Sequence, residues 1–309
     1  MKLYKPSFWS KKNSFIAYLL FPISIIVQLL RIIKNNIVKT KKYNVPIFCI
    51  GNIYLGGTGK TPMAIKIFEL LKQIDKRPAI IKKFYKSQID EIKLLENKTK
   101  KIFYNKSRDQ AIQEAIRQDS KTIILDDGFQ DNSIKKDLQM LCFNENQLIG
   151  NGFTIPSGPL REPFSSIKNS SIIFINGKPN LFFEKKINEI SKEIEIYYFN
   201  YKALNLEDFK NKKIMAFAGI GNPENFFKLL EKYNLNIKKK VSFPDHYGYK
   251  NTEIEKLISH AKENNFELIT TEKDYFRIKH LHSKNIKYLK IQIDIENEKK
   301  LVEKLKNYL

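Results

Sequence analysis

A glycine-rich turn between an apolar strand and a helix constrains this chain more than any other feature. Residues 47–61 read Ile-Phe-Cys-Ile-Gly-Asn-Ile-Tyr-Leu-Gly-Gly-Thr-Gly-Lys-Thr, and a helix is predicted over 62–71. Glycines let backbone N–H groups turn toward phosphate oxygens, Lys60 can reach the β- and γ-phosphates, and the Thr61 hydroxyl can ligate Mg²⁺. The N-terminal end of the helix adds positive charge. The turn therefore predicts a phosphate-binding loop, whose further residues are Gly56, Gly57, Thr58 and Gly59.

The loop departs from the usual P-loop motif at one position. That motif has glycine five residues before Gly59, where this chain has Tyr54, and Gly51 lies nearby instead. The alternative is a surface turn with a chance Gly-Lys-Thr. The order of strand, turn and helix favours the phosphate loop, because the motif requires that order.

Strand-like apolar runs alternate with helical stretches along the chain. This pattern predicts an α/β, P-loop NTPase-like fold with a mostly parallel sheet and flanking helices. Strands are predicted at 45–51, 78–83, 101–104, 122–126, 139–143, 172–175 and 194–199. Beyond a lysine-rich joint at 205–213, a smaller α/β domain is predicted, with strands at 214–218, 237–243, 268–271 and 286–291 and helices at 223–233, 252–264 and from Glu296 onward. The predicted division is an N-terminal helix at 1–40, a P-loop domain at 41–204 and a C-terminal domain at 205–309.

Charge and cysteine content narrow the class of protein without deciding it. The net charge is +22, with only six Arg among 55 basic residues. Such a charge suits a nucleic acid, an anionic membrane or a phosphorylated substrate, or reflects a lysine-rich composition. Aromatic and basic residues are not interleaved, which disfavours a nucleic-acid-binding protein. Cys49 and Cys142 lie in apolar runs and indicate reduced core residues of a cytosolic protein.

The N-terminal segment contains an apolar run at 15–33, interrupted by Pro22, Ser24, Gln28 and Arg31. A spanning helix needs about 20 predominantly apolar residues, so this run spans poorly. Lysines flank it on both sides, and Trp9 precedes it at the position of an interfacial indole. The pattern favours a helix lying in the membrane interface, with a buried amphipathic core helix as the alternative.

Two acids end a predicted strand at 122–130, which reads Thr-Ile-Ile-Leu-Asp-Asp-Gly-Phe-Gln. Carboxyl ends of parallel strands are where open α/β sheets bind ligands, so Asp126 and Asp127 are candidate Mg²⁺ ligands, with a plain turn as the alternative. Arg161 follows in the irregular segment 150–163. We expect its guanidinium group either to bind phosphate oxygens through two N–H donors or to form a salt bridge with Glu162 or another acid.

The second predicted domain offers fewer candidates. Gly-Ile-Gly-Asn-Pro at 219–223 is a turn between strand and helix, and Phe-Pro-Asp-His at 243–246 places His246 in a loop after a strand. Residues 270–274, Thr-Thr-Glu-Lys-Asp, are predicted to form a loop whose charges are mostly solvated.

Together these blocks resemble the tetraacyldisaccharide 4'-kinase family, the lipid A 4'-kinases. The family's Gly-Asn-x-x-x-Gly-Gly-x-Gly-Lys-Thr-Pro is matched at 51–62, including the unusual Tyr54. Asp-Asp-Gly-Phe-Gln at 126–130 and Gly-Pro-Leu-Arg-Glu-Pro at 158–163 also match, as do the blocks at 219–223 and 243–246, in the family's order. The resemblance spans nearly the whole chain.

The resemblance implies transfer of the ATP γ-phosphate, with Mg²⁺, to the 4'-hydroxyl of an acylated diglucosamine 1-phosphate at the cytoplasmic face of the bacterial inner membrane. It implies that Asp90 acts as the base and that His246 supports it. Lys60 and Arg161, argued above from their own motifs, complete the predicted catalytic residues. No obligate protein partner is implied. The family's Asp-Glu-Pro appears here as Asp-Glu-Ile at 90–92, and its Ser-Arg-Gly-Tyr-Gly as Lys-Lys-Phe-Tyr-Lys at 82–86. Another membrane-associated P-loop ATPase, or a kinase of a soluble substrate, is the alternative.

Overall fold

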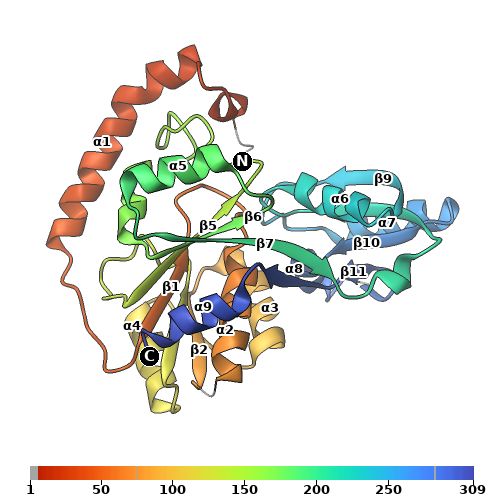
Figure 1. Cartoon of the computed structure of the whole chain (residues 1–309). Helices are drawn as coiled ribbons and strands as arrows, with labels where there is room; N and C mark the ends of the chain where they lie inside the picture. The colour runs from red at the N-terminus through yellow and green to blue at the C-terminus, as the bar shows by residue number, and fades with distance from the viewer. Residues whose placement is uncertain (1–5, 75, 282) are drawn as a thin grey trace. The chain divides into compact units, whose positions relative to one another are not determined.

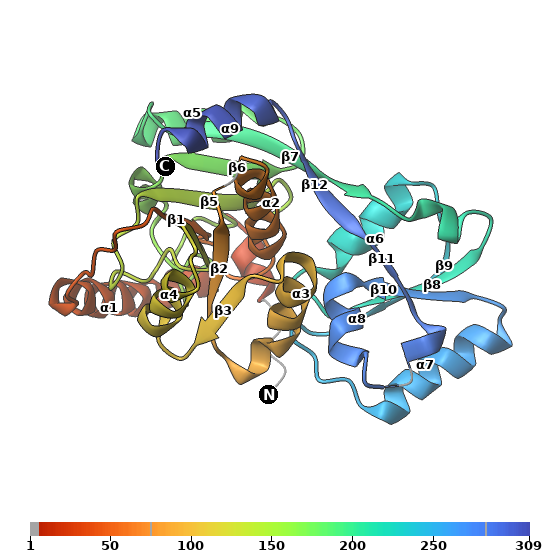
Figure 2. The same ribbon diagram turned by 90° about the horizontal axis from the view of Figure 1, so that it is seen from below.

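The computed structural model describes residues 6–74, 76–281 and 283–309, which form two compact units (Figures 1 and 2). The larger unit comprises 6–83, 101–200 and 294–309, and the smaller comprises 84–100 and 201–293. The chain passes between the units at residues 83–84, 100–101, 200–201 and 293–294.

The larger unit is built around an eight-stranded sheet in the order β12-β7-β6-β5-β1-β4-β2-β3. Each pair from β7 to β3 along this order is parallel, which confirms the predicted mostly parallel sheet. The strands are β1 (Ile47–Gly51), β2 (Pro78–Lys83), β3 (Ile102–Asn105), β4 (Thr122–Asp126), β5 (Leu138–Asn144), β6 (Ile172–Asn176), β7 (Glu195–Ala203) and β12 (Ile291–Ile295).

Helices cover both faces of this sheet because successive strand residues point to opposite sides. Ile47 and Cys49 of β1 share one apolar core with α4 (Arg108–Arg117) and α5 (Leu181–Ile190). Phe48 points the other way and contacts Tyr308, which follows α9 (Glu298–Lys306). α2 (Lys60–Gln73) joins α9 through the ion pair Lys66–Glu298, 2.7 Å long.

β12 was not predicted from the sequence. The strand expected at 286–291 is the short β11 (Lys287–Leu289), and after Lys290 a separate strand joins the larger sheet. The strand follows from an alternating pattern, since Ile293 and Ile295 are buried while Gln292 and Asp294 are exposed. The closing helix therefore begins at Glu298 rather than at Glu296.

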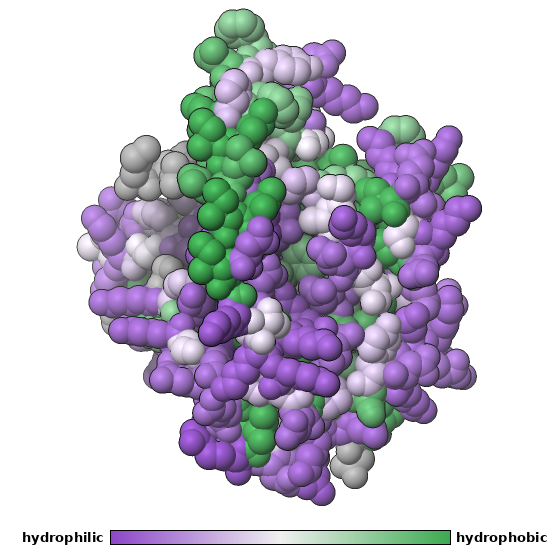
Figure 3. All heavy atoms as spheres, turned by 90° about the vertical axis from the view of Figure 1, so that its left-hand side faces the viewer, coloured by the Kyte–Doolittle hydropathy of each residue, from purple (hydrophilic) through white to green (hydrophobic). Residues whose placement is uncertain are grey.

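α1 (Phe15–Ile37) exposes most of its large apolar side chains (Figure 3). Within it only Ala17 and Ser24 are buried, so the alternative of a buried core helix is wrong. By length and composition α1 could cross a membrane, and it is compatible with membrane association. Trp9 is not placed as an interfacial indole, because it is 8% exposed and donates to the carbonyl of Pro156 at 3.0 Å.

The smaller unit has a parallel four-stranded sheet in the order β11-β10-β8-β9. β8 (Lys213–Ala218), β9 (Asn236–Ser242) and β10 (Glu267–Thr271) join β11, with α6 (Pro223–Lys232) packed on one face and α7 (Asn251–Glu263) on the other. α3 (Ile89–Thr99) belongs to this unit because it packs against α8 (Glu272–Ile278).

Candidate active site

The predicted phosphate loop is held in shape by one buried side chain. Asn52 is fully buried, and its amide donates to the carbonyl of Tyr54 at 2.6 Å, to the carbonyl of Gly56 at 3.3 Å and to the hydroxyl of Thr58 at 2.9 Å. Thr58 is 2% exposed, so its hydroxyl faces the protein. Asn52 belongs to the motif at 51–62, but the sequence does not indicate that its side chain shapes the loop.

The loop leads directly into the first turn of α2. Gly59 is the N-cap with φ 89°, a left-handed conformation that glycine adopts without a Cβ penalty. Lys60 and Thr61 are the first two helical residues, so their side chains start from the positive end of the helix dipole. At the end of β1, a Cβ on Gly51 would lie 2.4 Å from Phe129 Cβ, so glycine permits the close approach of the segment at 126–130.

Asp126 lies at the carboxyl end of β4, where the sequence predicts it, and is fully buried. Its Oδ2 accepts from the Thr61 hydroxyl at 3.2 Å and from Lys82 Nζ at 2.6 Å. Lys82 ends up here because β2 and β4 are neighbours whose register pairs Lys82 with Asp126. The sequence shows Lys82 only as a departure from the family's pattern, and strand order was needed to place it beside the acid.

Asp127 is surrounded by cations. Arg161 Nη1 lies 3.0 Å from Asp127 Oδ1, and Lys60 Nζ lies 3.8 Å from the same oxygen. Burial raises the pKa of Asp127, but Lys60, Arg161 and Lys82 outweigh it and lower the pKa to about 2. Of the two alternatives for Arg161, a salt bridge to an acid other than Glu162 is therefore present, and phosphate binding stays a prediction.

Two further arginines brace this cluster. Arg108 donates from Nη2 to the Asp127 carbonyl at 2.6 Å and from Nη1 to Asp131 at 2.8 Å. Arg31 of α1 donates to the Arg161 carbonyl at 3.1 Å and forms an ion pair with Glu162. α1 is thus bonded directly to the segment that carries Arg161.

In the described residues, no group of three or more His, Cys, Asp or Glu side chains is placed to hold a metal. Thr61 and Asp126 are nonetheless adjacent, and the buried Asp126 Oδ1 is an acceptor with no hydrogen-bond partner. Mg²⁺ at nucleotide sites is commonly bound by one or two protein oxygens together with phosphate oxygens and water. These two residues fit that pattern.

Asp90 and His246 lie together in the smaller unit, as their predicted roles require. Asp90, in the first turn of α3, is 4% exposed, and its Oδ1 lies 3.7 Å from His246 Nδ1. Its Oδ2 lies 2.5 Å from Arg277 Nη2 and 3.9 Å from Lys273 Nζ. Lys273 also pairs with Glu91 at 2.8 Å.

The environment of Asp90 makes its carboxylate a weak base. Burial alone raises its pKa, but His246, Lys273 and Arg277 lower the pKa to about 2. The family resemblance implies that Asp90 is a base, and surroundings that raised its pKa would have made it a stronger one. The structure shows the opposite shift, so Asp90 stays ionised wherever the pH is well above 2.

The segment at 270–274 is not the solvated loop that the sequence predicts. α8 begins at Glu272, which is 8% exposed, and Asp274 is fully buried. Asp274 accepts from the hydroxyls of Thr271 at 2.7 Å and Tyr249 at 3.1 Å, from the Gly219 amide at 2.9 Å and from Arg277 at 2.9 Å. Its short side chain fixes Arg277, which in turn pairs with Asp90.

We expect Asp274→Ala to destabilise the protein strongly. The substitution leaves the Arg277 guanidinium, two hydroxyls and an amide without their buried acceptor, and breaking a buried charge pair costs about 3–5 kcal/mol. Urea denaturation followed by circular dichroism measures the loss. Glu263→Ala, on the exposed end of α7, is the control and should change stability little; an equal loss in both variants would contradict the role of Asp274.

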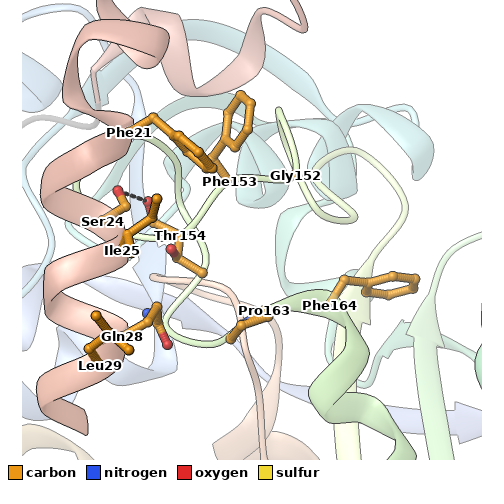
Figure 4. Close-up of a pocket in the computed structure, with 10 residues that line it drawn as sticks. All are labelled: Phe21, Ser24, Ile25, Gln28, Leu29, Gly152, Phe153, Thr154, Pro163 and Phe164. Carbon is orange, nitrogen blue, oxygen red and sulfur yellow. Dashed lines mark hydrogen bonds between the residues drawn. The ribbon is translucent and has the colours of Figure 1, made fainter. Parts of the chain in front are cut away.

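A groove of about 300 Å³ lies between α1 and the segment 152–164 (Figure 4). Its walls are mainly apolar, and Figure 4 shows Phe21 lying against Phe153, with ring centroids 5.3 Å apart. The Ser24 hydroxyl donates to the Thr154 carbonyl at 2.9 Å and fastens α1 to this segment. The other lining residues are Ile25, Gln28, Leu29, Gly152, Pro163 and Phe164.

Comparison with known proteins gives a consistent result. The sequence matches the model of the family described as tetraacyldisaccharide-1-P 4'-kinase over residues 16–101 and 89–309. A tetraacyldisaccharide 4'-kinase of Pelagibacter ubique (strain HTCC1062) is 43% identical over 309 residues, covering 99% of this chain and 98% of the relative. One of Rickettsia canadensis (strain McKiel) is 34% identical over 323 residues, covering 99% and 97%.

Among solved structures, the crystal structure of an "apo" form of LpxK from Aquifex aeolicus in complex with ATP has the same fold. Its TM-score is 0.68 at 23% identity, and the match covers 94% of this chain and 96% of that chain. The predicted fold class is thereby confirmed.

Proposed function

We propose, from the premise that this chain belongs to the tetraacyldisaccharide 4'-kinase family, that it transfers the ATP γ-phosphate to the 4'-hydroxyl of a tetraacyldisaccharide 1-phosphate, a lipid A precursor. The product is the bis-phosphorylated lipid. One observation of the structure carries the proposal: Lys60 and Thr61 open α2 directly beside Asp126 and Asp127. A loop, a lysine and two acids in that arrangement suit a nucleotide phosphate chain.

On the nucleotide side, the residues would align phosphates and offset their charge. Phosphoryl transfer asks mainly for positioning and charge stabilisation, which Lys60 and Arg161 would supply. Both cations now face Asp127, and phosphate oxygens would replace that carboxylate as their partner. Mg²⁺, held beside Thr61 and Asp126 when bound, would neutralise further negative charge.

On the acceptor side, Asp90 would orient the sugar hydroxyl and accept its proton. With its pKa near 2, Asp90 is a poor base at the start of the reaction, so transfer of the proton would come late, when the hydroxyl oxygen has begun to bond to phosphorus. His246, 3.7 Å away, would hold the carboxylate in position.

The lipid part of the substrate accounts for α1 and its groove. We propose that the exposed apolar side of α1 lies in the cytoplasmic face of the bacterial inner membrane, flanked by lysines that would attract anionic lipid. The apolar groove beside Phe21 and Phe153 supports a substrate with acyl chains.

Charged substitutions on α1 test its membrane role. Leu19 and Leu30 are 66% and 62% exposed. We expect Leu19→Glu with Leu30→Glu to weaken binding to anionic phospholipid vesicles at least about 100-fold, because each buried leucine contributes roughly 1.5–3 kcal/mol. Vesicle co-sedimentation measures the binding. Leu204→Glu changes a leucine outside α1 that is 53% exposed, and this variant should bind normally. If the double variant also bound normally, α1 would not be the membrane contact.

The activity itself is tested by incubating the purified protein with Mg-ATP and the tetraacyldisaccharide 1-phosphate in detergent. Thin-layer chromatography should show a bis-phosphorylated lipid. ATP hydrolysis without that product, or phosphorylation of the deacylated disaccharide alone, would favour an ATPase or a kinase of a soluble substrate.

A further inference from the structure

Lys82 is a buried lysine that pairs with Asp126, one of the two residues that fit a Mg²⁺ ion at the candidate phosphate site. Its side chain is 3% exposed and that of Asp126 is 0% exposed, with 2.6 Å between Lys82 Nζ and Asp126 Oδ2. The Thr61 hydroxyl donates to the same oxygen at 3.2 Å. The ammonium group thus stands beside the two side chains that would hold a divalent cation.

Stability does not explain this lysine well. Taking an ammonium and a carboxylate out of water costs about as much as their attraction returns, so a buried pair is often no better than an apolar pair. The residues before Lys82 on β2 are apolar and fully buried, which shows that the strand accepts apolar side chains. Lys82 therefore invites a role in the site.

The charges of the cluster suggest which role. Among the ion pairs of the described residues, Lys60 and Arg161 lie beside Asp127 and Lys82 lies beside Asp126, so three cations stand beside these two acids before any ligand binds. Such a site attracts the phosphate chain of a nucleotide and repels a free divalent cation. Without Lys82, the two remaining cations would only balance the two acids.

We propose that Lys82 is the resident counter-ion of Asp126, which keeps divalent cations out of the site until nucleotide phosphates arrive. The phosphates then supply the negative charge that lets a cation enter near Lys82. Asp126 Oδ1, buried and without a hydrogen-bond partner, is the acceptor left for the cation or its water. The order of binding is thus nucleotide with metal, never metal alone. This inference rests on the phosphate-site half of the proposed function.

The test measures metal binding to the purified full-length protein without nucleotide or lipid. Mn²⁺ serves as the probe, because electron paramagnetic resonance counts the free ion. Wild type should leave Mn²⁺ free, whereas Lys82→Met, which keeps length and loses charge, should bind it at least about tenfold more tightly. Lys82→Ser should also bind Mn²⁺ at least about tenfold more tightly than wild type. Mg²⁺ should raise the melting temperature of both variants and not that of wild type.

Matched variants separate this effect from a general loss of charge. Lys83→Met removes the next lysine of β2, whose side chain points to the other face of the sheet, and should behave as wild type. Adding Asp126→Asn to Lys82→Met should abolish the gained Mn²⁺ binding.

Two results would overturn the proposal: a tight Mn²⁺ site in nucleotide-free wild type, or no gain of binding in either Lys82 variant. If neither variant folds, the wild-type titration decides alone, since a tight site contradicts the proposal and its absence supports it. Failure to phosphorylate the lipid would refute the proposed function and leave this measurement unaffected.

Discussion

Lys60→Ala should abolish phosphate transfer, lowering turnover by about 10³-fold or more. Lys60 is the cation that begins α2 and lies 3.8 Å from Asp127, and a methyl group can neither reach a phosphate nor offset its charge. The measurement is initial-rate formation of the bis-phosphorylated lipid from radiolabelled ATP. The fold should be retained, because Lys60 is partly exposed and its loss opens no apolar cavity.

The control for this variant is Lys72→Ala, which removes an exposed lysine from the other end of the same helix. It should leave turnover within about twofold, because its charge is screened by solvent. A Lys60→Ala enzyme that kept even a tenth of wild-type turnover would remove Lys60 from the phosphate-binding role.

The second large effect is expected for Asp90. Asp90→Asn keeps the size of the side chain and removes the proton acceptor, so we expect kcat to fall by about 10²–10⁴-fold. The KM for ATP should change little, because the Asp90 cluster is separate from the phosphate loop in the sequence and in the division of the chain into units. Steady-state kinetics over a range of ATP concentrations separates the two constants.

The pKa shift adds a check on this role. Because the folded-state pKa of Asp90 is lowered to about 2, the carboxylate is charged throughout the neutral range, and its titration should not shape the activity profile above about pH 4. The lowered pKa also means that the ionised form stabilises the fold above the unfolded pKa and that this stability is lost as the pH falls toward 2.

The matched control for Asp90→Asn is Glu96→Gln, on the exposed side of α3. Unchanged kcat in Asp90→Asn would exclude the proton-acceptor role.

Local sequence was enough to place the glycine-rich turn between strand and helix. A strand, glycines and Lys-Thr in that order predict one structure, and Asp126 at a strand end follows from the same rule for parallel sheets. The pairing of Lys82 with Asp126 could not be predicted this way. It depends on β2 lying next to β4, and strand order is a property of the whole sheet.

Charged segments were the least predictable. The residues at 270–274 look like a polar loop, but Asp274 is buried because four separate partners satisfy its oxygens. None of these partners is recognisable from composition, and Tyr249 and Gly219 are distant in sequence. The same holds for Arg277, whose pairing with Asp90 requires α3 and α8 to pack together.

The three hydrogen bonds from the Asn52 amide bear on how quickly a ligand can be captured. A loop that is already held in one conformation loses little chain entropy when phosphate oxygens enter it. Capture of a nucleotide would then need no prior ordering of the backbone, and we expect the encounter to be governed by diffusion and charge rather than by a slow rearrangement. The chain entropy of the loop is lost once, during folding, and ordering the loop would not be repeated in each catalytic cycle.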